Sequence, residues 1–145
     1  MKRKHIILLI VLAVIAAGAF YGYSEYNRKN VDVAAEKPEF VVNVSAFIKD
    51  FEQDSAKASK KYIDKTVLVQ GQVKSVDTAG VISLANAGEM SSVQCMMDKR
   101  HSLDYSTIKE GSTVSIQGKC NGYQADELLG TDVKMNFCVI NNKHL

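Results

Sequence analysis

TVLVQGQV at residues 66–73 and TVSIQGKC at residues 113–120 are two similar stretches that decide the fold. In each stretch apolar residues alternate with other residues, and the sixth place is a glycine, Gly71 or Gly118. Alternation with a period of two predicts a half-buried β-strand. A strand that serves both halves of a small barrel must bend sharply, and a glycine inside the strand permits the bend. We therefore expect these stretches to be neighbouring strands of a closed barrel.

The other predicted strands follow the same alternation. The first strand begins at Thr66, and four further strands are expected at residues 80–85, 92–97, 112–121 and 132–140. A short helix is expected between Ser102 and Lys109, with Leu103 and Ile108 facing inward. Five strands with one helix after the third have the order of an OB barrel. The fold class is therefore mainly β, a five-stranded OB-type barrel.

A helix is predicted in front of the first strand and packed on the barrel. Asn43 or Ser45 can cap its N-terminus, because both side chains accept hydrogen bonds from backbone N–H groups. Apolar residues then recur at helical spacing and form one buried stripe, made of Phe47, Phe51, Ala58 and Tyr62. The stripe is typical of a helix that covers a core, and we do not assign it to a ligand site.

The first 24 residues have the pattern of a membrane anchor. Lys2, Arg3 and Lys4 form a basic head, and residues 6–24 contain no charge. A helix of that length rises roughly 28 Å, about the thickness of the hydrocarbon core. Aromatic residues that favour the headgroup region follow at its far end, namely Phe20, Tyr21, Tyr23 and Tyr26. The basic head should stay in the cytoplasm, which would place the rest of the chain outside.

A cleaved signal peptide is the alternative interpretation of this segment. Ala17-Gly18-Ala19 offers a small-x-small cleavage site after an apolar run. The run continues past that site through the aromatic patch, which favours retention. Lipid attachment near the N-terminus is not expected, because the first cysteine is Cys95.

Composition divides the chain into three parts. Residues after the apolar run are polar and mixed in charge, and they include the one proline, Pro38. We interpret them as a linker. The predicted parts are a signal-anchor helix at 1–24, a linker at 25–42 and an OB-fold domain with its N-terminal helix at 43–145.

The charge of the exported part argues against nucleic acid as the ligand. The chain has 18 basic and 16 acidic residues, and three of the basic residues precede the apolar run, which leaves 15 against 16. Residues 66–140 carry six Lys or Arg against eight Asp or Glu. Nucleic-acid binders gain much of their affinity by neutralising phosphates. The first three strands also lack the Phe, Tyr and Trp that would stack on bases.

An ordered set of helix and strand motifs spans residues 47–140. It consists of Phe51, Ala58, Lys61-Tyr62, Val69-x-Gly71-x-Val73, Val93-x-Cys95, Gly111-x-x-Val114-x-x-x-Gly118-x-Cys120-x-Gly122 and Cys138. This set resembles the tRNA_anti-like family, a group of OB-fold, lipoprotein-like proteins. The resemblance implies an OB fold in a bacterial envelope protein. It implies no activity and no catalytic residues, and this chain lacks the lipidation cysteine of a lipoprotein.

Residues that could support catalysis or metal binding are few. His101, in a basic triplet with Lys99 and Arg100, is the histidine inside the domain, and spacing reveals no Ser-His-acid or Cys-His arrangement. Soft donors suited to Cu(I) occur without Cys-x-x-Cys or Met-x-x-Met spacing, at Cys95, Met96, Met97, Cys120, Met135 and Cys138. Core packing explains them better. We predict no enzyme, and no catalytic, cofactor-binding or metal-binding residues.

The three cysteines form an odd set in a compartment that permits disulfides. Cys95 and Cys120 share a strand face with apolar residues, so we expect buried thiols. The inner face of the last strand is marked by its apolar set, Val133, Met135, Phe137 and Val139. Cys138 then points outward and is expected to be the most reactive thiol. A Cys120–Cys138 disulfide is the alternative, and it requires a bulge that flips the strand's phase.

These features predict a binding or accessory module outside the cytoplasm, held by one helix in the bacterial cytoplasmic membrane. The expected partners are the membrane itself and an envelope protein, peptide or glycan. Oligonucleotide binding through the OB fold is the alternative function.

Overall fold

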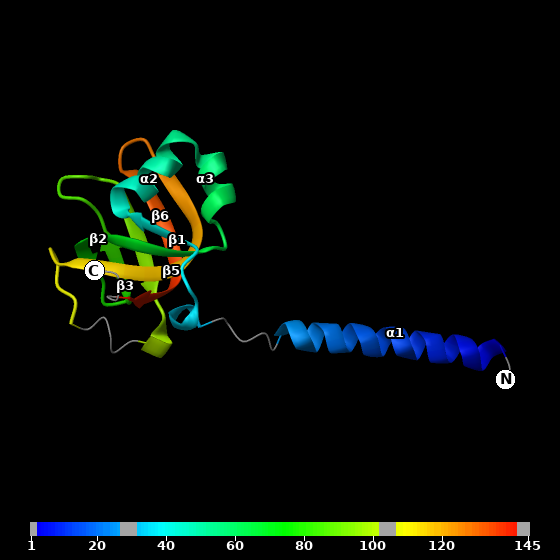
Figure 1. The fold of residues 1–145 in the computed structure, drawn as a ribbon. Helices are drawn as coiled ribbons and strands as arrows, with labels where there is room; N and C mark the ends of the chain where they lie inside the picture. Colours follow the sequence, from blue (N-terminus) through cyan, green and yellow to red (C-terminus); the bar gives the residue numbers. More distant parts are fainter. Residues whose placement is uncertain (1–2, 27–31, 102–106, 142–145) are drawn as a thin grey trace. The chain divides into compact units, whose positions relative to one another are not determined.

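The computed structural model describes residues 3–26, 32–101 and 107–141, and the chain forms two units. The first unit contains the N-terminal helix, and the second begins at Asp32 and contains the remaining elements (Figure 1). The two units are described separately.

The first unit is the helix α1 (Arg3–Tyr26), which is long and apolar enough to cross a membrane. The mean hydropathy of its best 18-residue window is 2.5. Its 24 residues would rise about 36 Å, more than the ~30 Å of a bilayer's hydrocarbon core. The predicted apolar helix is therefore confirmed as a helix with the dimensions of a membrane span.

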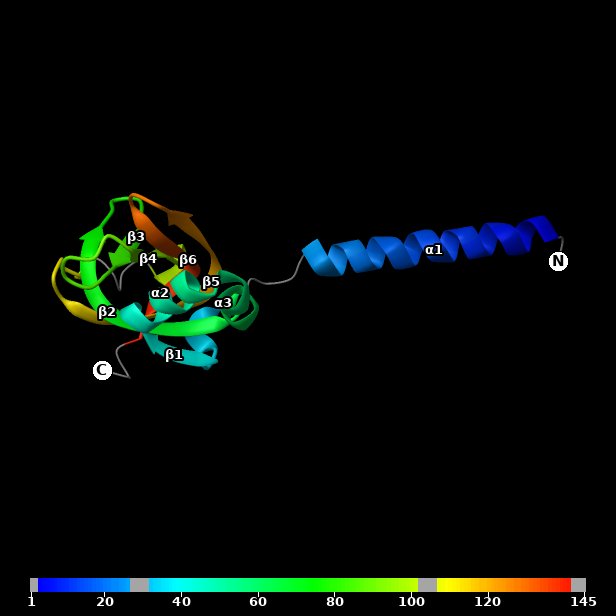
Figure 2. The ribbon, with the colours of Figure 1, turned by 90° about the horizontal axis from the view of Figure 1, so that it is seen from above.

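The second unit is a closed barrel with one additional strand. The strands are β1 (Phe40–Asn43), β2 (Thr66–Val76), β3 (Val81–Leu84), β4 (Ser92–Met97), β5 (Thr113–Asp126) and β6 (Gly130–Ile140). They pair in the order β1-β2-β3-β4-β6-β5, and a further pairing of β2 with β5 closes the barrel. Figure 2 shows β2 curving around the core. The predicted five-stranded OB-type barrel is confirmed as β2 to β6.

The two similar octapeptides form the antiparallel ladder that closes the barrel. Pairing runs from Thr66 opposite Lys119 to Gln72 opposite Thr113. Gly71 lies opposite Val114, and Gly118 lies opposite Val67, so the two glycines stand near opposite ends of the ladder.

Each of these glycines also leaves room for a neighbouring element. A Cβ at Gly71 would collide with the Val44 side chain of α2, and a Cβ at Gly118 would lie 2.5 Å from Cys138 Sγ. Packing therefore requires a glycine at both positions, in addition to the strand bend that the sequence predicted.

Two helices replace the single helix that the apolar stripe predicted. They are α2 (Val44–Gln53), capped by the Asn43 side chain as expected, and α3 (Ser55–Tyr62). Between them Asp54 leaves the helical conformation, and its carboxylate accepts a hydrogen bond from Lys57 N at 3.0 Å. An Asp that caps a new helix competes with continuation of the old one. The predicted stripe is buried on the barrel core, with Phe47, Phe51, Ala58 and Tyr62 all inside.

Residues 32–39, here called the N-terminal arm, belong to the folded unit. They contain the 3₁₀ turn η1 (Val33–Ala35) and lead into β1, which runs parallel to β2. Val33 is fully buried. The buried Gln117 amide donates to the carbonyls of Val33 and Glu36, at 2.8 and 2.7 Å. The folded unit therefore starts at Asp32, whereas polar composition placed a linker up to residue 42.

The segment between β4 and β5 begins with the short turn η2 (Lys99–His101). Residues 102–106 lie outside the described residues, so the helix expected at 102–109 is not among the elements described here. Ile108 is half-buried and packs against the barrel core.

Gly71→Ala tests the close packing of β2 against α2. The methyl group would collide with the stiff, β-branched Val44, so we expect a loss of about 1–3 kcal/mol in the free energy of unfolding. Urea denaturation of residues 32–145 measures it, with the exposed Ser75→Ala on the same strand as the control. Equal stability of Gly71→Ala and wild type would show that α2 can move away from β2 at no cost.

Candidate functional site

The outer face of the barrel has a hollow of about 230 Å³ over four strands. Its lining comes from β3, β4, β5 and β6. The lining residues are Val81, Gln94, Met96, Asn121, Lys134, Met135 and Asn136. Amide groups dominate its polar part, and amides both donate and accept hydrogen bonds. Such a hollow suits a polar, near-neutral ligand better than a polyanion.

Aromatic platforms are missing among the described residues that line this hollow. Tyr123 on β5 packs its ring against Phe51 of α2, with 5.2 Å between centroids. Phe137 on β6 is 38% exposed but is not part of the lining. Sequence-tolerant nucleic-acid binding relies on stacked aromatics beside positive charge. The hollow supplies one lysine, Lys134, and no described ring.

The loop that joins β5 to β6, here called the leucine loop (residues 126–130), presents two leucines to solvent. Leu128 and Leu129 are 82% and 69% exposed. The Asp126 carboxylate accepts hydrogen bonds from the backbone N–H groups of Leu128 and Leu129, at 2.8 and 3.0 Å. This bonding from side chain to backbone defines the turn. The leucines therefore project from a fixed backbone.

The loop that joins β3 to β4 lies beside the leucine loop. Ser91 Oγ accepts a hydrogen bond from Thr131 N at 3.0 Å and donates one to Glu52 of α2 at 2.9 Å. Between this loop and α2 is a hollow of about 350 Å³, lined by Ser45, Ile48, Lys49, Glu52, Glu89, Met90 and Ser91. Figure 1 shows the β5–β6 loop at the same end of the barrel as α2.

This end of the barrel, here called the acidic end, combines exposed apolar and acidic groups. Met90 is exposed like the two leucines. Four acids lie in these two loops and on α2, namely Glu52, Glu89, Asp126 and Glu127, against two bases, Lys49 and Lys74. Lys74 Nζ donates to the carbonyls of Glu89 and Met90. The arrangement offers apolar contact within a negative surface.

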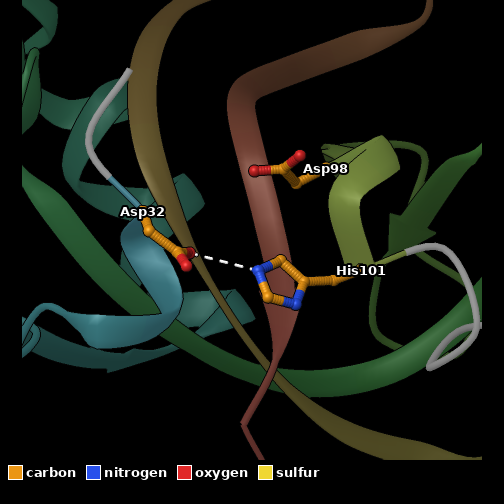
Figure 3. Close-up of side chains that lie close together, drawn as sticks. All are labelled: Asp32, Asp98 and His101. Carbon is orange, nitrogen blue, oxygen red and sulfur yellow. Dashed lines mark hydrogen bonds and ion pairs between the residues drawn. The ribbon is translucent and has the colours of Figure 1, made fainter. Parts of the chain in front are cut away.

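A second cluster joins the N-terminal arm to η2. One oxygen each from Asp32 and Asp98 and one ring nitrogen of His101 lie within 4.8 Å of one another. His101 Nε2 is 3.1 Å from Asp32 Oδ1, and Figure 3 shows the imidazole facing that carboxylate. Asp32 also caps η1 by accepting a hydrogen bond from Ala34 N at 3.1 Å.

Asp98 in this cluster is held by its neighbour Arg100. Arg100 Nε donates to both Asp98 oxygens at 2.9–3.0 Å, and Arg100 Nη2 donates to Asp98 Oδ2. These bonds lower the pKa of Asp98 despite its burial. Asp98 is 7% exposed and remains a carboxylate at neutral pH.

A third charged group braces α2 against α3. Tyr62 Oη donates to Asp50 Oδ2 at 2.6 Å, and Lys61 Nζ lies 3.2 Å from the same oxygen. The bond from Tyr62 is the main cause of a lowered pKa of Asp50. Burial is the main cause of a raised pKa of Tyr62. This group fixes the angle between the two helices.

Cys138 faces the core, so the prediction that it points outward is wrong. Phe137 has a φ of 54°, in the left-handed region, and the register of β6 against β4 and β5 shifts nearby. This irregularity turns Phe137 outward and Cys138 inward, which strict alternation does not foresee. Cys95 and Cys120 are buried as expected, and all three cysteines are free thiols.

The sequence profile of the tRNA_anti-like family matches residues 1–134. The chain belongs to this family. The resemblance found in the motifs is therefore confirmed over most of the chain. No curated protein matches the chain significantly.

Two solved structures are similar to this tRNA_anti-like protein. A "putative nucleic acid-binding lipoprotein" from Klebsiella pneumoniae subsp. pneumoniae MGH 78578 has a TM-score of 0.56 and 18% identity, over 80% of this chain and 100% of that chain. The hypothetical protein ygiW from E. coli has a TM-score of 0.34 and 12% identity, over 59% of this chain and 86% of that chain. The first likeness supports the fold assigned to the family member described here.

Sequence reasoning missed the Asp32–His101 contact in this tRNA_anti-like protein. It interpreted residues 99–101 as a basic patch, whereas Arg100 is bonded to Asp98 and His101 to Asp32. Asp32 and His101 are 69 positions apart. No spacing rule connects them, because the contact depends on where the N-terminal arm crosses the barrel.

Thiol reactivity tests the positions of the cysteines in this tRNA_anti-like protein. Burial raises the pKa of Cys120 to about 11, and burial raises the pKa of Cys138 well above its ordinary value. The thiolate is the nucleophile, so we expect no maleimide reaction at pH 7 in the native state. Three thiols should react after unfolding without reductant. One reactive native thiol, or a single thiol after unfolding, would contradict the packing described here.

Proposed function

We propose that this protein is a membrane-tethered OB-fold module that binds another protein of the bacterial envelope through its acidic end. The leucine loop carries the proposal. Leu128 and Leu129 project into water from a turn that Asp126 holds in place. Two adjacent exposed leucines at a hairpin tip are unfavourable for solubility, and such exposed apolar groups mark interaction sites.

The chemistry around the leucines favours a protein partner over a glycan. Glycan sites use flat aromatic faces and amides, whereas this end offers leucine, methionine and carboxylates. A complementary partner has an apolar pocket rimmed by Lys or Arg, because opposite charges at the rim steer association. The amide-lined hollow on the outer face, whose polar groups both donate and accept hydrogen bonds, fits a peptide or glycan better than this end does.

Localisation is part of the proposal. We assign α1 as a single retained span in the cytoplasmic membrane, with the barrel outside the cytoplasm. Its support is the length and hydropathy of α1, and the basic residues in front of it. We also propose that the module has no catalytic step; burial of its three thiols removes them as candidate nucleophiles.

Oligonucleotide binding is the second candidate function. It is motivated by the OB-type barrel, a fold that binds oligonucleotides in other proteins, and by the name of the similar Klebsiella structure. The amide-rich lining with one lysine, and the net charge of the exported part, favour the protein partner instead.

Paired serine substitutions test the acidic end. Leu128→Ser with Leu129→Ser should leave the barrel folded, because both side chains are exposed, and should remove the apolar contact. In membranes that carry the full-length chain, photo-crosslinking from position 127 should yield one envelope-protein adduct that the double variant loses.

Val41→Ser is the matched control, because Val41 is also an exposed apolar residue but lies on β1. It should keep the adduct. An adduct that persists in the double variant would exclude the leucine loop as the contact, and nucleic acid as the crosslinked partner would favour the second candidate.

The topology of the chain is tested independently. We expect the mature protein to retain its first residues and the barrel to be digested by protease added to spheroplasts. Mass spectrometry identifies the mature N-terminus, and immunoblotting follows the digestion of the barrel. A mature N-terminus near Phe20 would show a cleaved signal, and a protease-protected barrel would show the opposite orientation.

A further inference from the structure

The cluster of Asp32, Asp98 and His101 has a donor set that the anchoring and binding roles do not use. Its ligand atoms come from two segments, the N-terminal arm and the turn after β4, and lie within 4.8 Å of one another. Figure 3 shows Asp32 approaching from the N-terminal arm, and Asp98 and His101 from the turn after β4. From this geometry we propose that the cluster is a Zn²⁺ site that fastens the N-terminal arm to the barrel.

The donor types select the metal. One imidazole nitrogen with two carboxylate oxygens matches the nitrogen and oxygen ligands of zinc, with water completing a tetrahedron. Ca²⁺ and Mg²⁺ are hard cations that take oxygen ligands, with water completing their coordination, so the imidazole nitrogen favours zinc over both. The absence of a thiolate disfavours Cu(I).

Zinc binding requires the wider separations in the cluster, which are at most 4.8 Å, to shorten and the Asp32–His101 pair to open slightly. Zinc bonds of about 2.0–2.1 Å place tetrahedral ligands about 3.4 Å apart. His101 Nε2 and Asp32 Oδ1 are already 3.1 Å apart. Asp32 is exposed, so its side chain can rotate toward Asp98, which is buried and fixed by Arg100.

Charge favours a cation here. Asp32 and Asp98 bring two negative charges and Arg100 brings one positive charge, so the group is net negative when His101 is neutral. Arg100 also donates to the Asp98 oxygens that the metal would use. It therefore competes with the ion and weakens the site, so the additional fastening of the arm by zinc depends on the free zinc concentration.

Binding of Zn²⁺ would couple two segments that are far apart in sequence. It would replace the Asp32–His101 hydrogen bond by two bonds to one ion and add Asp98. An ion that binds only the folded unit stabilises it by mass action. The segment directly before β1 would gain most of this stabilisation.

The experiment is a calorimetric titration of ZnCl₂ into the full-length chain in detergent, without a polyhistidine tag. We expect one site per chain and a rise in melting temperature with Zn²⁺, but no response to MgCl₂ or CaCl₂. His101→Gln and Asp32→Asn should each weaken binding by at least about tenfold. His5→Gln is the matched control, since it removes a histidine from α1 and should change nothing.

Arg100→Gln separates a metal site from an ordinary ion-pair network. Removal of the competing guanidinium should tighten Zn²⁺ binding if Asp98 is a ligand. Far-ultraviolet circular dichroism verifies that each variant is folded; should Arg100→Gln not fold, the comparison of His101→Gln with His5→Gln decides. Absence of binding at millimolar Zn²⁺, weaker binding by folded Arg100→Gln, or unchanged binding by His101→Gln would overturn the proposal.

Discussion

The antiparallel pairing of β2 with β5 is the constraint on which the rest of the domain depends. Seven residue pairs close the barrel along this ladder. At one end, Gly71 leaves the space that Val44 of α2 occupies, and at the other, Gly118 leaves the space for Cys138 of β6. Closure of the barrel, docking of the helix and packing of the last strand therefore rely on one pair of strands with two missing side chains.

The same ladder attaches the N-terminal arm. Gln117 of β5 is fully buried, donates to the carbonyls of Val33 and Glu36, and accepts a hydrogen bond from Asn141 at 2.8 Å. A buried amide is costly unless such partners satisfy it. Leu68, the cross-strand partner of Gln117, is buried outside the main core cluster. The arm is thus an integral layer of the domain.

Local periodicity predicted the features that depend on neighbouring residues. The two octapeptides and the uncharged run that ends at Ser24 each specify one element, and each of these elements is present. The apolar stripe from Phe47 to Tyr62 is buried as predicted, but two helices carry it instead of one. The predictions that failed concern features that depend on contacts between distant parts of the chain. Phe137 adopts a positive φ that reverses the phase of β6, and the Asp32–His101 contact joins distant segments. A polar arm with a proline is ordered because Val33 is buried and Gln117 on another strand binds the arm's carbonyls, and neither contact is visible in the local sequence.

The hydrogen bonds from Leu128 and Leu129 to Asp126 have a thermodynamic consequence for any partner that receives these leucines. A flexible loop loses backbone conformational entropy when it binds, and that loss opposes association. Here folding of the domain has already ordered the backbone of the leucine loop, so the loss of conformational entropy on binding is smaller. A modest contact area can then yield useful affinity, and disorder introduced by Asp126→Ala would weaken binding without removing a single apolar atom from the interface.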